Sequence, residues 1–268
     1  DLVRSRGLGD VYKRQVLAAV AGLAALFLLA PLGLLIALSF DSSQWLQFPP
    51  PGWTLQWYAQ VFADPNWLAS LLTSLELGAV VTLASVLLGL LAGFAIARGR
   101  FPGRETLRGF FLTPMIMPSI VLGIALYAVF LRLHLAGTFL GFVLAHLVLA
   151  LPFSIVAITG ALEATDKSLE DAAMLCGAGL WEARVRVILP AIRHGIFSAA
   201  IFSFLTSWDE VVVAIFMASP GLQTLPVRML GEVRQNLSPD IAVVSSLLVL
   251  GTLLLMGLAA FFNKDAKR

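Results

Sequence analysis

Six long apolar stretches constrain the fold of this chain more than any other feature of its sequence. A helix needs roughly 20 mostly apolar residues to cross a hydrocarbon core about 30 Å thick, and each stretch is longer than that. None of them alternates between polar and apolar residues as membrane β-strands do. We therefore predict an all-α membrane protein whose six transmembrane helices lie at residues 16–40, 71–97, 109–131, 133–160, 192–219 and 241–262.

The composition of the chain also points to a lipid environment. The chain is 59% apolar and 13% charged, about half the charged share of an ordinary soluble domain. Its mean hydropathy is +0.90, so a water-exposed surface would have to be largely apolar. The single cysteine, Cys176, excludes an internal disulfide and a Cys-rich metal site. The net charge of +2 is too small to indicate a nucleic-acid partner.

The first fifteen residues are expected to lie outside the natural protein. Asp10-Val11-Tyr12-Lys13-Arg14-Gln15 is the in-frame translation of the end of a transposase-based sequencing adapter. We therefore interpret residues 1–15 as an assembly artefact, with a genuine basic N-terminal tail as the alternative. The six-span domain then covers residues 16–262, and residues 263–268 form a tail.

Lys and Arg are concentrated on one side of the predicted bundle. Basic loops stay on the cytoplasmic side of a membrane. The loops after the second and fourth stretches and the tail contain Arg98, Arg100, Arg104, Arg108, Lys167, Arg184, Arg186, Arg193, Lys264, Lys267 and Arg268. The other side contains Arg132, Arg228 and Arg234. We expect both termini to be cytoplasmic.

The outer loop of residues 41–70 is rich in tryptophan. Its members are Trp45, Trp53, Trp57 and Trp67. Amphipathic rings suit a segment among lipid headgroups, so the loop is either an interfacial anchor or a docking surface for an outside partner. Pro49-Pro50-Pro51-Gly52 prevents a helix there, and Thr54 is the expected N-cap of a short helix that runs through Phe62.

The cytoplasmic loop after the fourth stretch differs in composition from its surroundings. Ser168-Leu169-Glu170-Asp171 fits a capping box, which would open a helix over Ala172–Cys176. Gly177 or Gly179 can take the left-handed conformation that stops it. A second short helix is expected over Trp181–Leu189. The loop is therefore predicted to be a folded helical pair that projects from the membrane.

This loop, residues 163–190, resembles one family. Membrane subunits of binding-protein-dependent ATP-binding-cassette (ABC) importers carry a cytoplasmic signature of Glu-Ala-Ala, three residues, Gly, nine residues and Ile-x-Leu-Pro. The chain has this spacing, with Asp for Glu and Val for Ile, in Asp171-Ala172-Ala173, Gly177 and Val187-Ile188-Leu189-Pro190. The resemblance covers residues 16–262 and implies a type I ABC importer permease fold in a bacterial inner membrane.

The resemblance also implies contacts and partners. Asp171, Ala172, Ala173 and Gly177 would contact an ATPase subunit as the coupling helix, and Leu189 and Pro190 would set the angle into the fifth span. The partners would be a second, homologous permease, two ATP-binding subunits that hold ATP and Mg²⁺, and a periplasmic or extracellular solute-binding protein. The chain has no G-x-x-x-x-G-K-[ST], H-E-x-x-H or G-x-S-x-G motif, so we expect no catalytic residue, metal or cofactor in it.

Two adjacent carboxylates, Asp209 and Glu210, lie inside the fifth apolar stretch. An ionised carboxylate there costs about 2.5 to 3.5 kcal/mol on insertion scales, so the pair requires an explanation. With Trp208 adding cation–π attraction, it could line a cation pathway; a gate or an inter-subunit contact is the alternative. Glu76 is either a second pathway carboxylate or snorkels to the interface. His146 is expected to be a hydrogen-bonded packing residue rather than a proton carrier.

Within the family, the chain resembles the permeases of the polyamine branch. The similar segments are Trp57-Tyr58, Asp64-Pro65-Asn66-Trp67, Ser207-Trp208-Asp209-Glu210, Ser219-Pro220, Thr224-Leu225-Pro226 and Ser238-Pro239. The resemblance implies ATP-driven import of putrescine or spermidine by alternating access. The alternatives are an ABC permease for ferric iron or sulfate, and a secondary transporter or channel that uses Asp209 and Glu210 without nucleotide.

Overall fold

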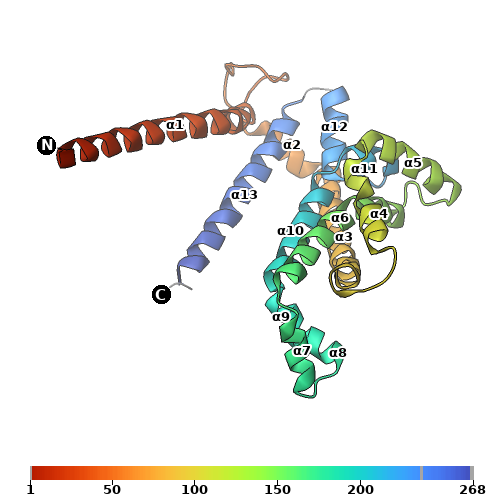
Figure 1. The fold of residues 1–268 in the computed structure, drawn as a ribbon. Helices are drawn as coiled ribbons and strands as arrows, with labels where there is room; N and C mark the ends of the chain where they lie inside the picture. The colour runs from red at the N-terminus through yellow and green to blue at the C-terminus, as the bar shows by residue number, and fades with distance from the viewer. Residues whose placement is uncertain (1, 236–237, 266–268) are drawn as a thin grey trace. The chain divides into compact units, whose positions relative to one another are not determined.

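The computed structural model describes the backbone of residues 2–235 and 238–265 and the side chains of residues 12–235 and 238–254. Two compact units divide the chain, residues 1–65 with 231–268 and residues 66–230, and each is described by itself (Figure 1). The described residues form helices and no strand. The helices are α1 (Leu2–Leu38), α2 (Gln56–Ala63), α3 (Pro65–Arg98), α4 (Arg104–Ile116), α5 (Ser119–Arg132), α6 (Phe139–Ala164), α7 (Ser168–Leu175), α8 (Leu180–Ala183), the π-helix η1 (Arg184–Ile188), α9 (Leu189–Ala191), α10 (Arg193–Trp208), α11 (Val212–Met217), α12 (Leu225–Gln235) and α13 (Asp240–Asp265).

Helix α6 is the centre of the unit formed by residues 66–230. It packs along α10 and also contacts α4, α5 and α11. Small residues allow these close approaches, because a Cβ atom on Gly195 of α10 would collide with Ala161 of α6. A buried hydrogen bond of 3.1 Å from the Ser203 hydroxyl to the Ser85 hydroxyl links α10 to α3. Such pairing is needed where lipid offers no partner for a polar group.

The long apolar helices match three of the predicted spans. Tyr12–Leu38, Pro65–Arg98 and Phe139–Ala164 are each long and apolar enough to cross a membrane. The number of candidate spans rises to as many as five if each of two bent helix pairs is counted as one span. The described part of α13, Asp240–Leu254, is a shorter apolar helix. The all-helical membrane architecture is confirmed in these residues, whereas two of the expected spans are broken.

The third apolar stretch is not one continuous helix, although its two helices together remain long and apolar enough for the predicted span. Helix α4 ends at Ile116, α5 begins at Ser119, and the two are bent by 105°. Pro118 causes the break, because it has no N–H to donate and it disfavours helical geometry in the preceding residue. Met117 accordingly has extended backbone angles of φ −76° and ψ 138°.

In the other unit, helix α13 packs against α1 and α2. The Tyr58 hydroxyl of α2 connects all three elements, because it lies 2.8 Å from the Ser39 hydroxyl, which follows α1, and 3.0 Å from the Ser246 hydroxyl of α13. Helix α1 runs without a break through residues 2–15. The interpretation of those residues as an artefact stays a prediction.

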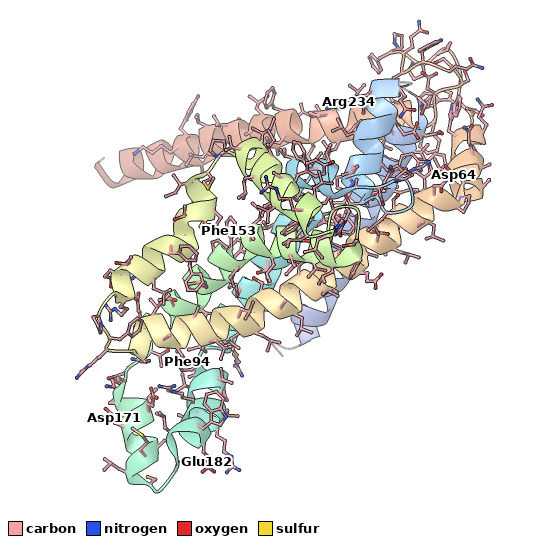
Figure 2. The ribbon with its side chains drawn as sticks, turned by 90° about the vertical axis from the view of Figure 1, so that its right-hand side faces the viewer. Asp64, Phe94, Phe153, Asp171, Glu182 and Arg234 are labelled. Carbon is pink, nitrogen blue, oxygen red and sulfur yellow. The ribbon has the colours of Figure 1, made fainter. Side chains whose placement is uncertain are left out.

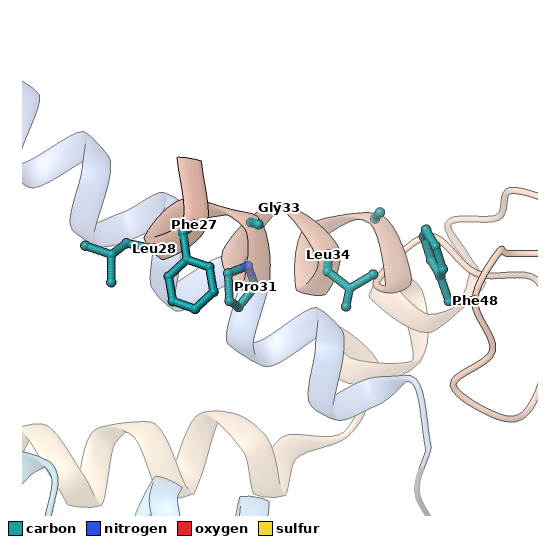
Figure 3. Close-up of a pocket in the computed structure, with 8 residues that line it drawn as sticks. Phe27, Leu28, Pro31, Gly33, Leu34 and Phe48 are labelled. Carbon is teal, nitrogen blue, oxygen red and sulfur yellow. The ribbon is translucent and has the colours of Figure 1, made fainter. Parts of the chain in front are cut away.

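An open apolar groove runs along α1 (Figure 3). It is lined by Phe27, Leu28, Ala30, Pro31, Gly33, Leu34, Ala37 and Phe48. None of these side chains offers a hydrogen bond or a charge, so the side chains of the groove supply apolar contact alone. An exposed surface of this kind needs lipid or another apolar protein surface against it.

Candidate functional site

The predicted coupling loop, residues 163–190, forms a helical hairpin of α7 and α8. Figure 2 shows Asp171 on α7 and Glu182 on α8 beyond the end of α3, where Phe94 lies. Asp171, Ala172 and Gly177 are exposed, and Ala173 is half-buried. The hairpin therefore presents the residues of the signature on a surface that another protein can reach.

The start of α7 differs from the prediction. The helix begins at Ser168, and no side chain caps it at the N-cap position, Lys167, so the predicted capping box is wrong. Instead, a carboxylate oxygen of Asp166 accepts the Ser168 N–H at 2.9 Å. Hydrogen bonds from Ser168 hold the pKa of the Asp166 carboxyl below its ordinary value. The aspartate two residues upstream thus takes the role assigned to the Ser168 hydroxyl.

The end of α7 is the glycine stop that the sequence predicts. Gly177 has φ +95°, a conformation that L side chains rarely adopt. Its N–H donates to the Met174 carbonyl at 3.0 Å, and the Ala178 N–H donates to the Ala173 carbonyl at 3.1 Å. These two bonds form a Schellman motif, which satisfies the last carbonyls of the helix.

Glu170 is the functional candidate that the sequence analysis missed. It is only 2% exposed, and its Oε1 accepts a hydrogen bond of 2.9 Å from Arg184 Nε. Its Oε2 lies 3.9 Å from Arg98 Nε. The Arg98 Nη2 in turn donates to the carbonyls of Leu162 and Thr165, at 3.0 and 2.7 Å, at the end of α6. No local pattern pairs residues this far apart in the sequence, so only the fold reveals the cluster.

The second helix of the hairpin continues to the fifth apolar stretch. It was predicted over Trp181–Leu189, and the structure has helical turns from Leu180 to Ala191 that include the π-helix η1. Pro190 accounts for the π turn, because it supplies no N–H to the carbonyl four residues earlier. The axis bends by 72° between this segment and α10. Leu189 and Pro190 thus lie next to the bend, and their role in setting it stays a prediction.

The fifth apolar stretch breaks at the two carboxylates, so the prediction of a continuous span is wrong. Helix α10 ends at Trp208 and α11 begins at Val212. A carboxylate oxygen of Glu210 accepts the Val213 N–H at 2.8 Å, which satisfies one of the free N–H groups at the start of α11. Asp209 follows α10 directly and is exposed. Both carboxylates therefore lie at helix ends, where the chain needs polar groups.

The other predicted pathway residues are placed differently. Trp208 is half-buried and stacks on Phe204, with ring centroids 5.7 Å apart and an interplanar angle of 18°. Glu76 lies on an exposed face of α3, and no hydrogen bond or ion pair joins it to Asp209 or Glu210. The structure therefore groups Trp208, Asp209 and Glu210 at the helix break, whereas Glu76 lies on α3, one turn or less from Gly78, which packs against Phe204 of α10.

His146 of α6 is fully buried behind the same region. Its Nδ1 lies 3.0 Å from the Ser207 hydroxyl of α10, one residue before Trp208. The Phe142 ring packs beside the imidazole, with centroids 5.8 Å apart. This is the hydrogen-bonded packing position that the sequence analysis favours over a proton carrier.

The loop that follows α1 is ordered by Asp41. Burial acts to raise the pKa of this carboxyl, but hydrogen bonds from Ser43 and Gln47 outweigh it, and the pKa lies below its ordinary value. The Trp57 indole donates to the Asp41 carbonyl at 2.8 Å. Helix α2 begins at Gln56 with Leu55 as its N-cap, so the prediction of Thr54 as the N-cap is wrong by one position. The Gln56 N–H nevertheless lies 3.2 Å from the Thr54 hydroxyl oxygen.

The four tryptophans of this region differ in exposure, and Trp57 is half-buried. Trp45 and Trp53 are 69% and 70% exposed, as an interfacial or docking surface requires. Trp67, in the first turns of α3, is instead buried, and the Arg228 guanidinium lies 4.6 Å from its ring centroid. Trp67 is therefore a packing residue and not part of an exposed aromatic surface.

Comparison with known proteins gives consistent matches. Residues 85–268 match the family model described as "Binding-protein-dependent transport system inner membrane component". The putrescine transport system permease protein PotI of Escherichia coli K12 is 31% identical over 243 residues, which are 88% of this chain and 86% of PotI. The spermidine/putrescine transport system permease protein PotC of the same strain is 27% identical, over 89% of this chain and 90% of PotC.

A solved structure shows the same fold. A chain in the crystal structure of a bacterial ABC transporter involved in the import of the acidic polysaccharide alginate matches with a TM-score of 0.71 at 16% identity. The match covers 96% of this chain and 97% of that chain. Together with the loop geometry, these matches show a transport subunit and not an enzyme. The chain belongs to the family of binding-protein-dependent transport system inner membrane components and is a permease subunit of an ABC importer.

Proposed function

We propose that this permease imports a polyamine, either putrescine or spermidine, across the bacterial inner membrane. The observation that carries the proposal is the pair of carboxylates at the break between α10 and α11, in a chain that is 31% identical to a putrescine permease. Polyamines are multiply charged cations that cannot cross lipid unaided. Carboxylates on the route attract such cations and repel anions such as sulfate.

Asp209 is the first candidate contact for the substrate. It is exposed, whereas the half-buried Glu210 already accepts the Val213 N–H with one of its oxygens. The face of the Trp208 ring that is not stacked on Phe204 can add cation–π attraction. Glu76 is a candidate for a second contact on α3. A role for Asp209 in a gate or in contact with the second permease is the alternative.

The coupling loop is the proposed docking site for the ATPase. Asp171, Ala172 and Gly177 are exposed on or beside α7, which supports a contact there, with Ala173 behind them. ATP and Mg²⁺ would be bound by two partner ATPase subunits, because this chain has no phosphate-binding loop. The second permease, homologous but distinct, and a solute-binding protein complete the assembly. Both termini would face the cytoplasm.

The proposed mechanism is alternating access. ATP binding closes the two ATPase subunits, the coupling loop moves with them, and the permease changes from an inward-open to an outward-open state. Nucleotide can drive this change only through contacts that differ between the two states. The bend of 72° before α10 and the break after it are positions at which the fifth apolar stretch can adjust its direction.

The test is transport by the reconstituted assembly in vesicles. ATP hydrolysis and uptake are measured with putrescine, spermidine, sulfate and ferric iron. We expect stimulation by a polyamine, and stimulation by sulfate alone would contradict the proposal. Hydrogen bonds to charged groups contribute about 1.5 to 3 kcal/mol, so Asp209→Asn should weaken polyamine uptake about tenfold or more. The control is Glu105→Gln, which removes an exposed carboxylate paired with Arg104.

A further inference from the structure

Helix α7 is not joined to the membrane helices by continuous helix. Thr165, between α6 and α7, has extended backbone angles of φ −93° and ψ 126°. On the other side, Gly177 has φ +95° and Gly179 is extended with φ −67° and ψ 157°. A force on α7 would rotate the helix about these two joints unless something else ties it to α3 and α6.

A buried ionic cluster provides such a tie. We call Glu170, Arg98 and Arg184 the ionic clamp. Glu170 on α7 accepts a hydrogen bond from Arg184 at the start of η1 and faces Arg98 at the end of α3. The clamp side chains are 3%, 10% and 23% exposed for Glu170, Arg98 and Arg184.

Each arginine of the clamp also has a second attachment. Arg98 donates to the Leu162 and Thr165 carbonyls, which end α6. The Arg184 guanidinium lies over the Phe94 ring of α3, 5.0 Å from its centroid. Through one hydrogen bond to Arg184 and one ion pair of 3.9 Å with Arg98, the carboxylate on α7 is linked to η1, to α3 and, by way of Arg98, to α6.

We propose that Glu170 is a positioning residue that makes α7 move as one body with the cytoplasmic ends of α3 and α6. Displacement of the exposed surface of α7 is then transmitted to the membrane helices instead of being absorbed at Thr165 and Gly177. The inference rests on the proposed docking of the ATPase at α7. It assigns the transmitting role to the buried Glu170, whereas Asp171, its exposed neighbour, would make the outer contact.

The charges of the ionic clamp explain why it should be most sensitive to substitution at Glu170. In the described residues, Glu170 is the only carboxylate within 4 Å of either guanidinium. Glu170→Gln would remove the one carboxylate that pairs with both poorly exposed guanidinium groups. The pair of Glu182 and Arg186 on the same hairpin provides the matched control, since it joins the same side-chain types at 2.7 Å on the exposed surface.

The experiment measures whether α7 and α6 keep a fixed separation. Cys176 is the only cysteine of the chain and is exposed after α7, so a spin label can be attached there. Because this position borders Gly177 on the proposed docking surface, the labelled parent assembly is first shown to retain ATP-driven putrescine uptake. A second label is placed by Gly160→Cys on an exposed position of α6, where a Cβ atom would have no neighbour within 4 Å. Pulsed electron resonance then gives the distance distribution between the labels in the full assembly, with and without ATP.

We expect one narrow distribution that ATP does not change in the parent protein and in Glu182→Gln. Glu170→Gln should broaden it and lower putrescine uptake per ATP hydrolysed about tenfold, within the usual range of coupling between sites. Arg184→Lys keeps the charge but removes the Nε–H, and it should give a smaller change in the same direction. If Glu170→Gln does not assemble with its partners, Arg184→Lys decides the question by the same two measurements.

Two results would overturn the inference. One is a narrow distribution in the clamp variants, and the other is a broad distribution with uptake per ATP as in the parent protein. Failure of the proposed function would look different. In that case the parent assembly itself would show no ATP-driven uptake, whereas the distance distributions would still report whether the clamp holds α7 to α6.

Discussion

Replacement of Gly177 by alanine isolates the contribution of one backbone conformation to the coupling loop. Gly177 has φ +95°, and a Cβ atom added to it would have no neighbour within 4 Å. The substitution therefore introduces conformational strain without a steric collision in this chain. A side chain in the left-handed region costs about 1 to 2 kcal/mol.

This cost should appear as more frequent opening of the end of α7. A change of 1 to 2 kcal/mol corresponds to a factor of about 5 to 30 in the opening equilibrium. Hydrogen exchange followed by mass spectrometry measures it at the amides of Cys176, Gly177 and Ala178, which donate to carbonyls of α7. Gly177→Ala should accelerate their exchange by that factor, and Gly177→Asn by less, since asparagine tolerates this conformation better.

Gly179→Ala is the matched control. Gly179 has φ −67°, which alanine adopts freely, and it also has open space around its Cβ position. Its variant should exchange like the parent protein. Equal acceleration in the two alanine variants, or none in Gly177→Ala, would refute the assignment of Gly177 as a conformational helix stop. A bulky residue at position 177 should in addition abolish uptake while leaving membrane insertion intact, because it would fill the proposed docking surface.

Three further predictions concern single hydrogen bonds. Glu210→Ala removes the acceptor of the Val213 N–H and should lower the stability of the purified chain by about 1 kcal/mol, measured from its thermal midpoint. Glu210→Gln keeps an acceptor and should leave the midpoint unchanged. Equal losses of stability in the two variants would contradict the capping role. Ser207→Ala should cost about 1 to 3 kcal/mol because it removes the hydrogen-bond partner of the buried His146 Nδ1. Ser198→Ala, at a half-buried serine bonded only to its own helix, should cost little in the same melting assay. The pKa of Asp166 is depressed in the folded chain, so its support of α7 should be complete above pH 3.8 and should be lost as the pH falls further, through the folded pKa. The protection of the Ser168 amide should show this loss, and Asp166→Asn should remove its pH dependence.

The coupling loop was largely predictable because its signals are local. Gly177 stops α7 through its own backbone angle, and Pro190 shapes the helix around it by its missing N–H, so each acts within a few residues of its position. The start of α7 was misjudged because Asp166 and Ser168 both suit a helix start. The structure gives the role to the aspartate.

The sequence does not show how sharply the third stretch bends or where the fifth one breaks, because long apolar runs hide their interruptions. Pro118 was visible, but proline is also found within membrane helices, as Pro152 of α6 is here. Asp209 and Glu210 were interpreted only as a functional pair. Their position at helix ends shows that a charged residue in an apolar run can also mark where the backbone needs a partner.

The ionic clamp lay beyond sequence reasoning altogether. Glu170 meets Arg184 from 14 positions away and Arg98 from the end of a different membrane helix. The three residues lie in three different helices, so no pattern in one sequence brings them together. The same holds for His146 and Ser207, which meet only because α6 and α10 pack side by side.

The most direct test of the account is polyamine uptake into vesicles by the purified permease pair, with and without the ATPase subunits. The account predicts that putrescine or spermidine accumulates only when the ATPase, ATP and the solute-binding protein are all present. Accumulation by this chain in vesicles that lack nucleotide would contradict it, because the import would then draw its energy from another source.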